Sequence, residues 1–177
     1  RTLRYALQPG KRRPRREMNS DMHKSDRPDM SKPLVIAHVT GYYIPGLGYQ
    51  ENHLPFEQAA IGNEVHIVTG DRLVPHPSYQ TVYAPHVGQR YVGPGRHVER
   101  GVTIHRLHVP LELEHHNNPW ISGTVSLIDR LRPDIVHLHG VTPMSSLKVI
   151  FSAASHRHAL VCDHHLCGFN LLPFTAA

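Results

Sequence analysis

The sequence has few cysteines and lacks any long hydrophobic run. Cys162 and Cys167 are the two cysteines among 177 residues, too few for the disulfide framework of many small secreted domains. We expect both thiols to be reduced, buried and inert, because no second Cys or His pair stands at a spacing typical of zinc sites. A membrane-spanning helix needs about 20 consecutive apolar residues, and no run here approaches that length. The first residues also lack the hydrophobic segment of a signal peptide. These absences predict a cytosolic protein.

The formal net charge is +5, but the excess of basic residues is confined to the N-terminal part. Residues 1–33 contain ten of the nineteen Lys and Arg residues and four acidic residues, so the remainder is nearly neutral. Residues 1–32 are rich in charge and proline, and we expect a disordered basic tail or a start site placed too far upstream. The basic run over residues 11–16 leaves a peripheral contact with anionic lipid open. The neutral remainder predicts no nucleic-acid partner.

From residue 33 onwards, signals for strands and helices alternate. Short apolar runs predict five strands, the first of them buried on both faces, and apolar residues at helical spacing predict three helices. We expect strands over residues 33–40, 64–69, 102–107, 134–139 and 159–163, and helices over residues 51–61, 118–132 and 145–154. In the first helix, Pro55 should lie in the first turn and Ile61 should be buried. Residues 70–100 contain four prolines and predict no regular element.

This alternation predicts an α/β domain over residues 33–177, with a Rossmann-like, mainly parallel sheet and helices on both faces. Ligands of such sheets bind beyond the carboxyl ends of the strands. The loops expected to form a site are residues 41–50, 70–72, 139–144 and 163–168.

The loop after the first strand contains Gly46 and Gly48. Glycines let a backbone approach a ligand closely, and the N-terminus of the following helix favours an anion such as a diphosphate. The spacing is not G-x-G-x-x-G, so the dinucleotide fingerprint is not met. A turn that needs glycine for its geometry explains the loop equally well.

Histidines stand at the ends of the fourth and fifth strands. His137 and His139 share one face of a strand, and Asp163, His164 and His165 follow each other after the next. These residues could bind a metal, donate hydrogen bonds to a substrate, or simply pack in the core. Because the chain contains 17 histidines, chance clusters are expected, and we predict no metal site.

Five passages in order resemble the N-terminal domain of the family 4 glycosyltransferases, which have the two-domain GT-B fold. They are IAHVT with the PGLG loop that follows it, GNEVHIVT, GVTIHRL, LRPDIVHLHG and ALVCDHH, within residues 33–168. The resemblance implies a retaining transferase that moves a sugar from a nucleotide-sugar donor to a carbohydrate or lipid-linked acceptor. It implies no cofactor besides that donor.

The resemblance also implies roles for particular residues. It places Gly48, together with Gly46 and Tyr49, against the donor diphosphate, although the family usually has a second glycine where Tyr49 stands. It places His165, with His164 beside it, among the catalytic residues.

The N-terminal domain of this family mostly shapes the acceptor site, to which we assign His139 and Gly140. The family's C-terminal domain supplies most donor contacts, including a pair of glutamates, and we expect that domain to be missing from this chain. Since the reactive cleft forms between the two domains, the chain alone should not transfer sugar.

Two alternatives stay open. Asp163-His164-His165 after a buried strand resembles the signature of the DHH phosphoesterases, which hold two metal ions with aspartates from several strands. Here only Asp71 follows an earlier predicted strand as a candidate second aspartate. The other alternative is a non-enzymatic domain that binds a nucleotide or sugar through the same loops.

Overall fold

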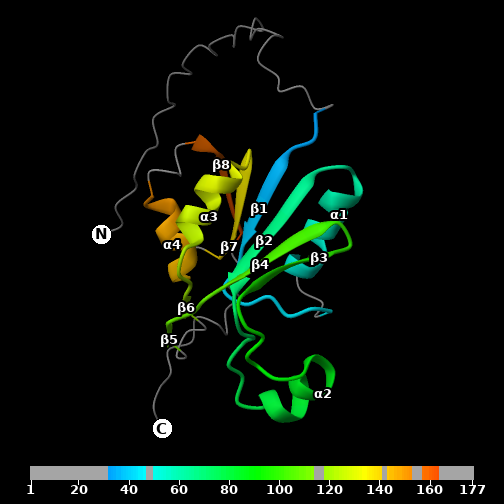
Figure 1. Ribbon diagram of the computed structural model, residues 1–177, viewed down its shortest axis with the longest axis vertical. Coiled ribbons are helices and arrows are strands. Elements are labelled where there is room, and N and C mark those ends of the chain that lie inside the picture. Colours follow the sequence, from blue (N-terminus) through cyan, green and yellow to red (C-terminus); the bar gives the residue numbers. More distant parts are fainter. Residues whose placement is uncertain (1–31, 47–49, 114–117, 141–142, 153–156, 164–177) are drawn as a thin grey trace, which may run out of the picture. The chain divides into compact units, whose positions relative to one another are not determined.

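A mostly parallel sheet forms the centre of the domain. The computed structural model describes residues 32–46, 50–113, 118–140, 143–152 and 157–163 (Figure 1). Within these residues the main sheet has six strands in the order β3-β4-β2-β1-β7-β8. The strands are β1 (Val35–Val39), β2 (Glu64–Gly70), β3 (Gly95–Glu99), β4 (Val102–Leu107), β7 (Ile135–His139) and β8 (Ala159–Asp163). Neighbouring strands from β4 to β8 pair in parallel, and β3 pairs antiparallel with β4.

Successive parallel strands are added first on one side of β1 and then on the other, so the strand order reverses beside β1. From β1 the chain continues to β2 and then β4 on one side, and returns to β7 and then β8 on the other. The parallel strands therefore have the order typical of Rossmann-like folds, and the α/β prediction is confirmed. In such sheets ligands bind where the order reverses, outside the carboxyl ends of the strands. Here that position lies between β1 and β7.

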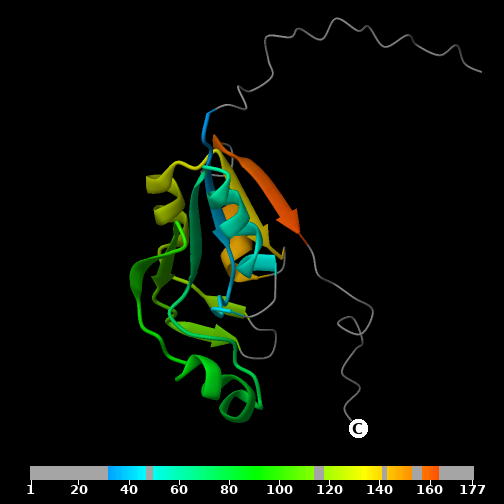
Figure 2. The same cartoon turned by 90° about the vertical axis from the view of Figure 1, so that its right-hand side faces the viewer.

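Helices lie on both faces of the sheet, as expected. Helix α1 (Leu54–Ala60) lies on one side, whereas α3 (Thr124–Leu131) and α4 (Met144–Ile150) lie on the other (Figures 1 and 2). The core under α1 consists of Ile36, Tyr43, Phe56, Val65, Ile67, Val102 and Ile104. The core under α3 and α4 consists of Ala37, Val39, Val68, Leu127, Ile128, Val136, Leu138 and Val149. Alternate residues of each strand thus enter opposite cores, because successive side chains point to opposite faces.

Helix α1 is shorter than the predicted helix over residues 51–61. A 3-10 turn (Gln50–Asn52) precedes it, and Pro55 lies in its first turn as expected. The prediction that Ile61 is buried was wrong, since its side chain is 80% exposed. Ile61 follows the last helical residue, and the chain turns at once through Gly62 at φ 99°.

The predicted helix over residues 118–132 begins later than expected. Residues 118–120 instead form strand β6 (Asn118–Trp120), which pairs antiparallel with β5 (Leu111–Leu113). Gly123 precedes α3 in the left-handed region, at φ 77°, and this conformation separates strand from helix.

Residues 70–100 contain structure that the sequence did not predict. A π-helical turn (Tyr79–Tyr83) leads into α2 (Ala84–Val87), and β3 follows. The hairpin between β3 and β4 turns at Arg100 (φ 46°) and Gly101 (φ 84°). Positive φ at both positions matches the twist of a tight hairpin.

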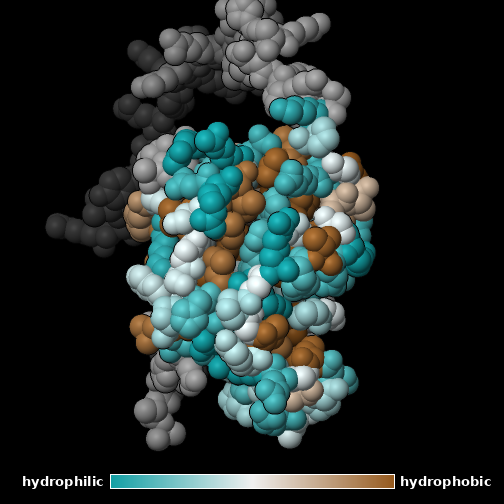
Figure 3. All heavy atoms as spheres, viewed as in Figure 1, coloured by the Kyte–Doolittle hydropathy of each residue, from teal (hydrophilic) through white to brown (hydrophobic). Residues whose placement is uncertain are grey.

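The remaining predictions concern the exposure of Cys162, the N-terminal tail and membrane-spanning helices. The face in Figure 3 is mostly hydrophilic, with hydrophobic side chains in small groups. The burial expected for Cys162 was wrong, because its strand lies at the edge of the sheet and its side chain is exposed. The predicted tail lies outside the described residues, except for Lys32. Among the described helices, none has the length and apolar character to cross a bilayer.

Candidate functional site

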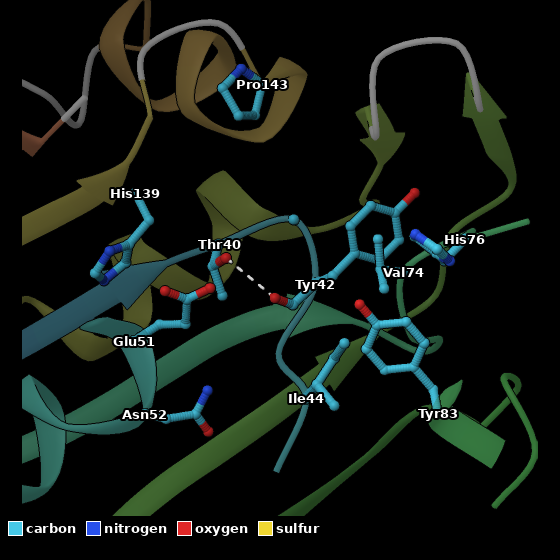
Figure 4. Close-up of a pocket in the computed structure, with 11 residues that line it drawn as sticks. Thr40, Tyr42, Ile44, Glu51, Asn52, Val74, His76, Tyr83, His139 and Pro143 are labelled. Atoms are coloured by element: carbon cyan, nitrogen blue, oxygen red, sulfur yellow. Dashed lines mark hydrogen bonds between the residues drawn. The ribbon is translucent and has the colours of Figure 1, made fainter. Parts of the chain in front are cut away.

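A pocket of about 350 Å³ lies at the carboxyl ends of β1 and β7 (Figure 4). Its lining comes from four parts of the chain: the loop after β1, the 3-10 turn before α1, the segment after β2, and the residues at and beyond the end of β7. These residues are Thr40, Gly41, Tyr42, Ile44, Glu51, Asn52, Val74, His76, Tyr83, His139 and Pro143. The pocket therefore occupies the position that the strand order predicts for a ligand.

The backbone after β1 is held against β2. The Thr40 amide donates to the carbonyl of Val68 (3.1 Å), and the Gly70 amide donates to the carbonyl of Gly41 (3.4 Å). The Thr40 hydroxyl donates to the carbonyl of Tyr42 (3.3 Å), the bond drawn in Figure 4. These bonds fix the loop that forms one wall of the pocket.

Asn52 supplies a polar atom without a partner at this site. Its side chain is 7% exposed, and its Oδ1 has no hydrogen-bond partner among the described residues. A buried acceptor left unpaired costs free energy.

A buried ionic network supports the wall at Tyr42. The Tyr42 hydroxyl donates to Glu112 Oε1 (2.5 Å). Glu112 also pairs with Arg90, and its Oε2 lies 3.7 Å from Nη1 of Arg72. Burial and the hydrogen bond to Glu112 raise the pKa of Tyr42, so the phenol stays a donor. The network joins the first loop to β5 and to the segment after β2.

Asp71, which follows β2, is engaged in a structural arrangement. It is completely buried, accepts from Nε of Arg72 (2.9 Å), and lies 3.2 Å from Nδ1 of His108. Its carbonyl accepts the amides of Val92 and Gly93. Asp71 therefore holds the segment over residues 70–100 in place.

Three histidines gather beside the pocket, on the face of the sheet that α1 covers. His38 of β1 is in register with His137 of β7, and their rings are 5.0 Å apart. Nδ1 of His38 lies 3.0 Å from Nε2 of His139, and Nε2 of His38 lies 2.7 Å from Oε1 of Gln58 on α1. The exposed fractions of the three residues are 0%, 6% and 9% for His38, His137 and His139.

Asp163, the last residue of β8, orients two of these rings. Its Oδ2 lies 3.0 Å from Nε2 of His137 and 2.9 Å from Nδ1 of His139. Its Oδ1 accepts the amide of Gly140 (3.2 Å). Gly140 has φ 89°, and a Cβ there would come within 3.3 Å of Pro143. A glycine therefore lets the chain turn sharply enough to bring its amide to Asp163.

The protonation of His38 follows from its burial. Removal from water lowers the pKa of His38 to about 3, although the hydrogen bond to Gln58 acts in the other direction. His38 is neutral near pH 7 as a result. A second buried pair, His66 and His105 (3.2 Å), lies on the opposite face of the sheet, so it is not part of the pocket.

The predicted site residues fall into three groups. His139 lines the pocket, and Gly140 follows it. Gly46, at φ 74°, instead lines a neighbouring hollow of about 280 Å³ that shares Ile44 and Tyr83 with the pocket. The other predicted residues, Gly48, Tyr49, His164 and His165, lie outside the described residues.

Three members of the site, His38, Asn52 and Tyr42, were not predicted from the sequence. For His38 a signal existed, since a histidine near the end of the first strand would face His137 if the two strands were neighbours. Asn52 and Tyr42 stand in an expected site loop or just beyond it, but nothing in their spacing marked them.

The arrangement offers hydrogen-bond donors and acceptors, an aromatic side chain and imidazole groups to a small polar ligand. Comparisons with protein families, with curated proteins and with solved structures find no match for this chain.

Proposed function

We propose that this chain is the acceptor-side, N-terminal half of a retaining glycosyltransferase that uses a nucleotide-sugar donor. The observation that supports the proposal most is one pocket lined both by the loop after β1 and by His139 at the end of β7. The resemblance assigns Gly46, Gly48 and Tyr49 of this loop to the donor side, and we assign His139 to the acceptor side. Gly46 lines the adjoining hollow, which shares Ile44 and Tyr83 with the pocket. The meeting of the two sides is what a transferase needs if donor and acceptor are to react.

The polar groups of the pocket suit a carbohydrate. Glu51, Asn52 and His139 line it with side chains that exchange hydrogen bonds with hydroxyl groups, and Tyr83 adds an aromatic side chain. A few fixed polar groups in a concave site give orientation and specificity.

Sugar transfer also requires that water be excluded and that donor and acceptor be aligned. We propose that a second domain provides this by closing over the pocket and binding most of the donor. The chain alone is then expected to bind nucleotide sugars weakly and to transfer none.

The test is a titration of the purified chain, in EDTA, with UDP-glucose, UDP-N-acetylglucosamine and GDP-mannose, followed by NMR. We expect weak binding of at least one donor, which His139→Ala weakens several-fold. His97→Ala is the matched control, because His97 is an exposed histidine on β3. A parallel assay for released UDP or GDP should detect no turnover.

Each outcome bears on the proposal. If no donor perturbs pocket residues, or if both variants bind equally, the proposal fails. Tight, saturable binding without turnover would favour a non-enzymatic binding domain. Turnover by the chain alone would refute the need for a second domain.

A metal-dependent phosphoesterase is the second candidate, because Asp163 contacts two of the three buried histidines, His137 and His139. Against a two-metal site of the DHH type, Asp71 is already paired with Arg72 and His108. Phosphatase activity that needs added metal and is lost on Asp163→Asn would favour this candidate.

A further inference from the structure

The three buried histidines beside the pocket have the placement of a metal centre. We propose that His38, His137 and His139 bind one divalent transition-metal ion, with Zn²⁺ the best fit. The sequence analysis predicted no metal because 17 histidines make chance clusters common. The proposal does not depend on the proposed function, since it rests on the geometry of these side chains alone.

Distances among the three rings suit a single ion. One nitrogen from each histidine can be chosen so that all three lie within 4.8 Å of one another. Zinc–nitrogen bonds of about 2.0–2.1 Å at tetrahedral angles place ligand nitrogens roughly 3.3 Å apart. Nδ1 of His38 and Nε2 of His139 are 3.0 Å apart, so an ion between them needs a shift of a few tenths of an ångström.

Each histidine has an oxygen acceptor at one nitrogen. Oε1 of Gln58 faces Nε2 of His38 (2.7 Å). Oδ2 of Asp163 faces Nε2 of His137 (3.0 Å) and Nδ1 of His139 (2.9 Å). Metal-bound histidines almost always donate their second N–H to a carboxylate or carbonyl in this way, which fixes the tautomer and the ring orientation. For His139 the contact lacks hydrogen-bond geometry, so this ring would have to rotate to donate to Asp163. The second nitrogen of each ring would then be available as a ligand.

The protonation of the His38 and His139 rings also favours a metal ion between them. If His38 donates from Nε2 to Gln58 and His139 carries its proton on Nδ1, beside Asp163, both rings are neutral. They then present lone pairs to each other across 3.0 Å. A metal ion accepts both lone pairs and removes the conflict. Without metal, the alternative is a hydrogen-bonded chain in which Gln58 turns its amide nitrogen towards His38.

The ligand type narrows the choice of ion. Imidazole suits zinc, copper, nickel and iron, whereas magnesium and calcium prefer oxygen ligands. Three protein ligands leave one position for water or a small ligand, as in catalytic zinc sites. Because His139 lines the pocket, we place that position on the pocket side.

The test is metal binding by the full purified chain after chelation. Competition titrations with Zn²⁺ against a chromophoric chelator should give one tight site per chain, and metal analysis after desalting should recover one ion. Substitution with Co²⁺ should give the visible spectrum of a tetrahedral site without thiolate charge-transfer bands. Loss of one ligand by His139→Ala should abolish the tight site, whereas His97→Ala, which removes an exposed histidine of β3, should keep it.

Asp163→Asn provides a variant that leaves all three ligands in place. Loss of a partner of this kind typically weakens metal binding 10- to 100-fold, and we expect a fall in that range. If His139→Ala does not fold, as judged by circular dichroism, Asp163→Asn and the Co²⁺ spectrum still decide. Equal zinc binding by all variants, or no tight site in the unmodified chain, would overturn the proposal in favour of the hydrogen-bonded chain.

Discussion

Replacing Tyr42 by phenylalanine removes one hydroxyl from the network under the pocket wall. That hydroxyl donates to Glu112, whose side chain is 8% exposed, at 2.5 Å. Arg72 and Arg90 stay beside Glu112, so the carboxylate does not become an isolated buried charge. The variant therefore measures one charge-assisted hydrogen bond and little else.

Hydrogen bonds to charged groups contribute about 1.5–3 kcal/mol to stability. Since Tyr42 is half-buried and Glu112 keeps its two arginines, we expect a loss of about 1.5–2 kcal/mol in the free energy of unfolding. With a urea dependence of about 2 kcal/mol per molar, the midpoint should fall by roughly 0.7–1 M. The loss should shrink in a Glu112→Gln background, because the acceptor charge is already gone.

Urea denaturation, followed by circular dichroism and tyrosine fluorescence, measures this difference. Tyr91→Phe is the matched control, since Tyr91 is 61% exposed and the same atom is removed. Its free energy of unfolding should change by less than about 0.5 kcal/mol. If both variants lose the same stability, or if the loss at Tyr42 is unaffected by Glu112→Gln, the network does not stabilise the wall as described.

Two further predictions concern the sheet. Burial lowers the pKa of His105 to about 4, below the ordinary value near 6.5, so the unfolded chain binds the extra proton and stability falls as pH drops from about 6.5 to 4. The free energy of unfolding changes by at most about 1.4 kcal/mol per pH unit for one histidine. His105→Gln should reduce this pH dependence, and the exposed-site control His97→Gln should not. Urea titrations at pH 7 and pH 5 measure the difference. A Cβ at Gly70 would lie 2.8 Å from Cγ2 of Val109, whereas one at Gly95 meets nothing within 4 Å. Gly70→Ala should therefore cost about 1–3 kcal/mol by overpacking and Gly95→Ala should cost little, and equal unfolding midpoints would contradict the packing described at Gly70.

Four of the five parallel strands, β1, β2, β4 and β7, could be predicted from sequence because most of their side chains are buried. Strand β8 is mostly exposed at the sheet edge, but residues 159–162 also form an apolar run. Strand β1 reads as an unbroken apolar run apart from His38, and such runs leave little choice of structure. Strand β3 has one apolar residue, Val98, and most of it is exposed at the sheet edge. Residues 95–99 form a strand because they pair with β4, and no local sequence pattern shows that pairing. Segments stabilised by tertiary contacts alone escape sequence analysis for this reason.

The candidate site was also only partly predictable from the sequence. The strand ends could be predicted to form a site, because parallel topology fixes which edge binds ligands. The grouping of His38 with His139 could not, because it depends on β1 and β7 being neighbours. Asn52 is a member of the pocket only because a 3-10 turn precedes α1. Its unpaired oxygen depends on exact side-chain placement.

The central position of β1 also affects how the protein reaches its native state. His38 and His139 meet across 101 residues of chain, so the pocket does not exist until a distant segment has closed onto the first strand. Contacts of such long range slow folding, although the entropy of closure grows only slowly with loop length. A small molecule that needs both strands would recognise the completed fold alone. Its presence would raise the melting temperature by an amount that grows with the logarithm of its concentration above Kd, which makes thermal shift a direct screen for the natural ligand.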